Sequence, residues 1–173
     1  MFVHELAKIV SPWNSLYADS KTVATGVTAV HILALLFGGG LALAADRTTL
    51  RALKRPVSER ITQLRELRAV HRPVVIALVL LFVSGMAMAL ADVNTFATSA
   101  YFWVKMGLVT LLMANGFYLL VVERRLNAAV ERAGPPEPVV EPALWRHLRR
   151  ASFASLTLWG LTALAGALLT GMA

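Results

Sequence analysis

The chain has 173 residues, of which 57% are hydrophobic and 16% charged, and its mean hydropathy is +0.64. Soluble domains are about half apolar and about a quarter charged, so this composition indicates a membrane protein. The absence of cysteine excludes disulfides, iron–sulfur clusters and c-type haem attachment. The net charge of +7 would suggest a nucleic-acid partner in a soluble protein. Here the basic residues gather in two segments, which favours a topological cause and no nucleic acid.

Residues 1–20 form the first predicted element, an amphipathic helix that lies on the membrane surface. Trp13 and Tyr17 are side chains that suit the headgroup level, and Ser11-Pro12 divides the segment into two short pieces. An anchor in the interface is the plain interpretation, and a docking surface for a partner is the alternative. The apolar residues that recur at helical spacing are Phe2, Leu6, Ile9, Trp13 and Leu16, with His4, Glu5 and Lys8 on the other side.

Four apolar runs follow, and none of them contains Asp or Glu. Crossing a hydrocarbon core takes roughly 20 apolar residues, so each run predicts one membrane span. No carboxylate pair is therefore expected inside the membrane. The sequence predicts an all-α, integral-membrane four-helix bundle in a single domain, 1–173, with the amphipathic helix at its N-terminus. The predicted spans are 22–45, 73–91, 100–122 and 151–172.

Fourteen of the 17 Lys and Arg residues lie in segments 46–72 and 123–150. The positive-inside rule predicts that both segments are cytoplasmic loops of a bacterial inner-membrane protein, with the N- and C-termini outside. Residues 57–70 repeat apolar side chains at near-heptad spacing, which predicts a helix that runs into the second span. Pro73 then suits the first turn of that span. The stretch GPPEPVVEP predicts an extended loop before the fourth span.

His31 is an ionisable residue inside the first span, in the stretch VTAVHILALLFGGG. Such residues face the protein interior and often mark functional sites. Its neighbours on the same helix face are mostly small, including Ala34 and Gly38, which leaves room for another helix or for a flat cofactor such as haem. Two alternatives stay open: an axial ligand of a metal, or a neutral imidazole hydrogen-bonded to a hydroxyl or carbonyl of another helix.

A haem with two axial ligands needs a second one besides His31. Met86 and Met106 lie at similar predicted depth, although methionine in apolar helices is usually filler. The same His and Met ligands would suit copper. Lys105 either reaches the outer surface or pairs with Asp92, and the alternative is contact with a haem propionate or a quinone head.

His71 and His147 lie near the cytoplasmic ends of the second and fourth spans, where they could approach each other as a surface pair. Residue counting places His71 about 20 Å from His31 along the membrane normal, at about 1.5 Å per residue. These two histidines are therefore not expected to ligate one haem. No Ser/His/Asp order, HExxH or phosphate-binding loop occurs, so no residue is assigned a catalytic role, and the chain is not expected to be a catalyst on its own.

Several residues in or next to the four spans form a pattern: His31, Gly38, Asp46-Arg47, Ser84-Gly85, Phe102, Lys105 and Trp159. In this pattern the chain resembles an uncharacterised bacterial family of four-helix inner-membrane proteins, known as a domain of unknown function. Through HILALLFGG and FWVKMGLV it is more weakly similar to the membrane part of copper-resistance D proteins. Both resemblances imply metal or haem redox work in an inner membrane.

The leading expectation is a small inner-membrane protein that binds or supports a b-type haem, with His31 as axial ligand, within a redox assembly. A cofactor-free accessory subunit of a larger complex is the first alternative, and a copper-handling protein the second. The expected partners are the lipid bilayer and other membrane subunits or further copies of the chain.

Overall fold

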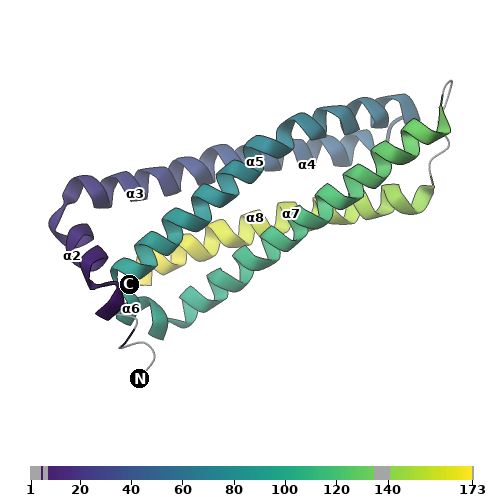
Figure 1. The fold of residues 1–173 in the computed structure, drawn as a ribbon. Coiled ribbons are helices and arrows are strands. Elements are labelled where there is room, and N and C mark those ends of the chain that lie inside the picture. The colour runs from purple at the N-terminus through teal and green to yellow at the C-terminus, as the bar shows by residue number, and fades with distance from the viewer. Residues whose placement is uncertain (1–4, 6–7, 135–140, 173) are drawn as a thin grey trace.

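The computed structural model describes residues 5, 8–134 and 141–172, and all regular elements in these ranges are helices (Figure 1). Four helical stretches are long and apolar enough to cross a membrane. The predicted all-α four-helix membrane fold is therefore confirmed. In chain order the elements are α2 (Ser11–Asp19), α3 (Lys21–Ala34), the π-helical turn η1 (Leu35–Gly39), α4 (Gly40–Ala52), α5 (Val57–Ala91), α6 (Val93–Thr98), α7 (Ala100–Ala133) and α8 (Pro142–Met172).

The long helices extend well beyond the predicted spans. α3, η1 and α4 form one helix of 32 residues, while α5 has 35 residues and α7 has 34. A hydrocarbon core takes only about 20 of these. Each helix therefore continues for several turns into segments 46–72 and 123–150. For residues 57–70 this confirms the predicted helix that runs into the second span, whereas the sequence predicts loops for the rest of these segments. Pro73 lies inside α5, not in its first turn.

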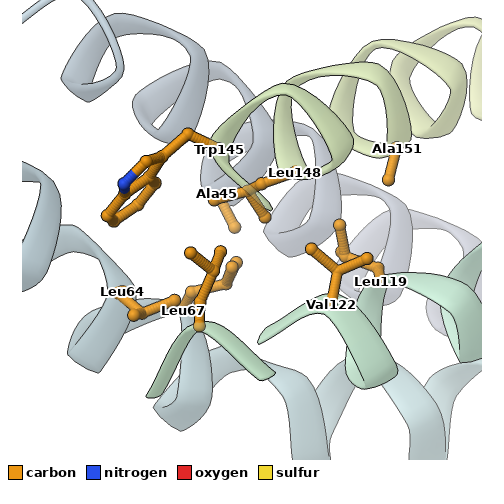
Figure 2. Close-up of a cluster of buried hydrophobic side chains, with 9 residues drawn as sticks. Ala45, Leu64, Leu67, Leu119, Val122, Trp145, Leu148 and Ala151 are labelled. Carbon is orange, nitrogen blue, oxygen red and sulfur yellow. The ribbon is translucent and has the colours of Figure 1, made fainter. Parts of the chain in front are cut away.

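The basic segments are helical because an apolar stripe runs through them. Leu64, Leu126 and Leu148 are at most 2% exposed, while the arginines take the outer faces of the same helices. Burial of this stripe against the other helices stabilises helical turns in segments that a hydropathy count assigns to loops. The resulting core lies next to the basic segments, and Figure 2 shows its side chains between the helices. Its buried members are Ala45, Leu64, Leu67, Leu119, Val122, Leu126, Trp145, Leu148 and Ala151.

The bundle consists of two helical hairpins. α3 packs along α5, and α7 packs along α8. The hairpins are joined mainly through α4, which contacts both α5 and α8, whereas α5 and α7 share only a small contact. In Figure 1, α3 and α8 lie well apart at the end of the bundle that carries α2 and α6. The side of the bundle between α5 and α7 is thus the least tightly closed.

The N-terminal helix α2 docks on the end of α5. The indole Nε1 of Trp13 donates a hydrogen bond of 2.8 Å to the carbonyl of Ala87, and the Asn14 amide donates to the carbonyl of Ala91. Ser20 caps the next helix by accepting from the Val23 amide. The surface position of residues 1–20 stays a prediction. Phe2, His4 and Leu6, and most of the GPPEPVVEP stretch, lie outside the described residues.

Two glycines of the GGG run bring neighbouring helices close to η1. A Cβ on Gly38 would collide with the Cβ of Ala77 on α5, and one on Gly39 would lie 3.3 Å from the Trp159 ring on α8. Both glycines are buried, whereas Gly40 is exposed. The wide π turn therefore lies where the first membrane helix contacts both α5 and α8.

Candidate functional site

His31 on α3 is held by α5. Its Nδ1 lies 2.9 Å from the hydroxyl oxygen of Ser84, which donates its own proton to the carbonyl of Leu80 at 2.5 Å. Because a hydroxyl has one proton, we assign the Nδ1 proton to His31 as the donor to Ser84. The lone pair of a neutral His31 ring is then on Nε2.

The ring fits beside Ser84 because the next residue is glycine. A Cβ on Gly85 would lie 3.2 Å from Cε1 of His31. Ala34 and Gly38, one and two turns along from His31, are buried, and Gly38 packs against Ala77 of α5. The small-residue face around His31 is thus filled by α5, and its first use is the close approach of two helices.

The other residues predicted near His31 are only partly brought to it. Lys105 on α7 reaches α8, where its Nζ lies 3.4 Å from the position of a Cβ on Gly166. Met86 follows Ser84 by two residues, which turns it about 200° away from the face that holds His31. Met106 is partly buried and follows Lys105 directly. The structure therefore places Lys105 against α8 and places Met86 off the face of α5 that holds His31.

A second polar cluster, which the sequence analysis missed, lies in the basic half of the bundle. Nδ1 of His71 on α5 is 2.7 Å from Oε2 of Glu123 on α7, and these side chains are 12% and 5% exposed. Asp46 on α4 is 2% exposed and close enough to His71 for electrostatic interaction. Two buried carboxylates and a histidine from three helices thus lie in the same half of the protein. Asp46, His71 and Glu123 all lie outside the predicted spans, so the expectation of no carboxylate pair inside the membrane stays a prediction.

The cluster has unused hydrogen-bonding capacity. His71 Nδ1 and Glu123 Oε2 are at ion-pair distance but are not aligned as a hydrogen bond, and neither atom has another partner within the described ranges. Ser155 and Ser152 on α8 offer hydroxyl donors to the carboxyl group of Asp46. Its Oδ1 is buried without a partner among the residues that the structure covers. Buried polar atoms without partners are rare, and each asks for an explanation.

The helical register explains why these residues point inward. His71 continues the buried positions Leu64 and Leu67 at spacings of three and four, and Glu123 lies between the buried Leu119 and Leu126 in the same way. Asp46 follows the buried Ala42 by four residues. This spacing is visible in the sequence. A hydropathy count hides it because each charged residue ends an apolar run.

His147 lies outside this cluster. It is exposed, and its Nδ1 is 2.8 Å from the hydroxyl oxygen of Tyr118 on α7. His71 instead faces Glu123. The two histidines of the predicted surface pair are therefore each engaged by a residue of α7.

Two hollows meet at His71. A cavity of about 210 Å³ lies between the helices on the membrane side, lined by apolar side chains together with Asp46, His71 and Ser155. A groove of about 540 Å³ opens on the basic side between α5 and α7. Its charged and polar lining residues are Arg68, His71, Arg72, Glu123, Arg124, Asn127 and Glu131.

The fold and this cluster define a four-helix membrane protein with an internal protonatable site. Among the described side chains, no three His, Cys, Asp or Glu residues are grouped as metal ligands. No protein-family model, curated protein or solved structure matches the chain.

Proposed function

We propose that this protein is a subunit of a redox assembly in a bacterial inner membrane. In this proposal Asp46, His71 and Glu123 exchange protons between the cytoplasmic surface and the membrane interior. The observation that carries the proposal is the burial of these three groups together, on α4, α5 and α7. Ionisable side chains are costly inside a membrane protein, and those present usually serve protons, ions or substrates.

The position of the cluster supports proton exchange. His71 lines both the polar groove and the apolar cavity. A proton that reaches His71 from the groove is therefore on a residue that also borders the cavity. Histidine and carboxylates both gain and lose protons readily. His71 Nδ1 and Glu123 Oε2 are 2.7 Å apart, so a reorientation of the side chains is enough to align them for proton transfer. The basic residues around the groove support a cytoplasmic position for it by the positive-inside rule.

The proposal is tested in inverted membrane vesicles from cells that lack the chain. We expect respiration to acidify these vesicles more slowly than wild-type vesicles, as read by a pH-sensitive dye. The wild-type chain should restore the rate and Glu123→Gln should not. Glu131→Gln is the matched control, since Glu131 lines the same groove but is exposed. Equal acidification with and without the chain would overturn the proposal.

A b-type haem ligated by His31 is the second candidate. The hydrogen bond from Nδ1 to Ser84 favours it, because a ligating histidine commonly donates its other ring proton in this way, which leaves Nε2 for iron. Lys105 is the residue that would pair with a propionate. Haem supplies one-electron transfer where it is bound.

Absorption spectra separate this candidate from a cofactor-free accessory subunit. Purified protein from haem-replete cells is compared, oxidised and dithionite-reduced, with His31→Ala. A Soret band that is lost in the variant supports ligation by His31. A flat spectrum of the wild-type protein overturns the haem candidate and leaves the proton-exchange proposal standing.

A further inference from the structure

We propose that the cavity between α5 and α7 binds a lipid-soluble quinol, with a ring hydroxyl donating to Oδ1 of Asp46. This inference rests on the proposed function and names the class of molecule that the protonatable cluster serves. Its basis is the coincidence of four features in one place: volume, a buried acceptor without a partner, a histidine and an opening to lipid.

The volume of the cavity selects the size of the ligand. An engineered apolar cavity of about 150 Å³ holds a benzene molecule. A cavity of about 210 Å³ therefore holds one substituted ring, and a porphyrin is too large for it. Trp159 and Phe117 are among the lining residues, and both offer aromatic surfaces to a flat ring.

The polar lining selects the chemistry. Oδ1 of Asp46 is buried without a hydrogen-bond partner in the described part of the chain, and Asp46 lines the cavity. Ser155 and Ser152 offer hydroxyl donors to the Asp46 carboxyl, but a carboxylate accepts about four hydrogen bonds. A ligand hydroxyl would give Oδ1 a further donor, which a hydrocarbon ligand would not. A quinol supplies hydroxyl donors on a flat ring. His71 lines the same cavity and is placed to exchange a proton with the bound hydroxyl.

The walls of the cavity indicate how the ligand enters. Val75, Val79, Met113 and Phe117 line it and are also exposed on the outer faces of α5 and α7. α5 and α7 share only a small contact, so these side chains form an apolar mouth between the two helices. In a membrane this mouth faces lipid. A ligand that enters there must be lipid-soluble, and the hydrocarbon tail of a quinol can stay in the bilayer while its ring occupies the cavity.

Binding of ubiquinol-1 to the full chain in nanodiscs tests the inference. The reference ligand is the dimethyl ether of ubiquinol-1, which has a similar ring but no hydroxyl donors. We expect saturable binding of the quinol and at least about tenfold weaker binding of the ether, the factor that corresponds to loss of one good hydrogen bond. Equal binding of the two ligands would show that the cavity holds only apolar groups, such as lipid chains, and would overturn the inference.

Two variants locate the binding. Gly116 lines the cavity, so Gly116→Leu should fill it and abolish quinol binding. Gly107→Leu is the matched control on α7, because a Cβ at Gly107 meets nothing within 4 Å. Asp46→Leu has a similar branched shape but no acceptor oxygen, and it should remove the preference for the quinol over its ether. Retention of that preference in Asp46→Leu would also overturn the inference, even if Gly116→Leu failed to fold.

The two proposals can fail separately. Saturable quinol binding with no effect of the chain on vesicle acidification would overturn the proposed proton exchange and support the quinol site. An acidification defect without quinol binding would overturn the quinol site and support the proposed proton exchange.

Discussion

Gly85 of α5 and His31 of α3 approach so closely that a Cβ on Gly85 would lie 3.2 Å from the ring carbon Cε1. That separation is tighter than ordinary van der Waals contact, so the ring keeps its place beside Ser84 only while residue 85 has no side chain. The hydrogen bond between His31 and Ser84 therefore depends on a neighbour that makes no polar contact with either of them.

Gly85→Ala should displace the His31 ring and weaken its hydrogen bond to Ser84. The cost of overpacking is about 1–3 kcal/mol of unfolding free energy. The ¹⁵N chemical shifts of the His31 ring, assigned with His31→Ala, report the hydrogen bond directly. Gly107→Ala is the control, since a Cβ there meets nothing within 4 Å. Unchanged His31 shifts in Gly85→Ala would contradict the contact.

Gly38→Ala should separate η1 from α5, because the new methyl group would collide with the methyl group of Ala77. We expect a loss of about 1–3 kcal/mol in unfolding free energy. Gly40→Ala, two residues on, is exposed and meets nothing, and it should gain up to about 1 kcal/mol from helix propensity. Unfolding in a denaturing detergent titration measures both. Similar stabilities for the two variants would show that the helices are not in contact at residue 38.

The pair His71 and Glu123 should be strongly coupled in stability. Removing one partner of a buried pair costs about 3–5 kcal/mol because the other is left uncompensated. We therefore expect His71→Leu and Glu123→Leu each to destabilise the bundle by about this amount. The double variant should lose clearly less than the sum of the two. Additive losses in this double-mutant cycle would show that the 2.7 Å contact carries no energy.

Trp13→Phe should release α2 from α5 without unfolding the bundle. The variant loses the 2.8 Å hydrogen bond to Ala87, which contributes about 0.5–1.5 kcal/mol. Backbone amides of α2 should then exchange with deuterium faster, while the unfolding temperature of the bundle stays unchanged. Trp103→Phe is the comparison, since its indole donates to Ala97 at 3.0 Å near the start of α7. It should leave exchange in α2 as it is in the wild type.

The number and order of the membrane helices could be predicted because hydrocarbon burial needs long apolar runs. The start of α5 could also be predicted, because residues 57–70 repeat apolar side chains at near-heptad spacing. The extension of α7 could not. Residues 123–133 are too charged for lipid, yet they are helical because Leu126 packs against other helices. Hydropathy averages over all faces of a helix, whereas packing depends on one face.

Some residues of the candidate site could be predicted from the sequence and others could not. His31 stands out because it interrupts an apolar run, but Ser84, its partner, is 53 residues away, and nothing local connects the two. Asp46 and Glu123 mark the ends of apolar runs, so the sequence assigns them to loops. Their spacing from Ala42 and Leu119 would have placed both on the buried face.

The π turn at Leu35–Gly39 has one consequence for how such a chain changes over evolutionary time. A π turn commonly holds one residue more than an α-helix needs. Deleting that residue would leave a regular α-helix in which α3 and α4 keep their relative orientation, so His31 and Asp46 would both keep their places. A deletion in the regular part of α4 before Asp46 would instead turn the Asp46 side chain by about 100° away from the interior. The π turn is thus a place in the first membrane helix where the chain can change its length by one codon without moving the acid.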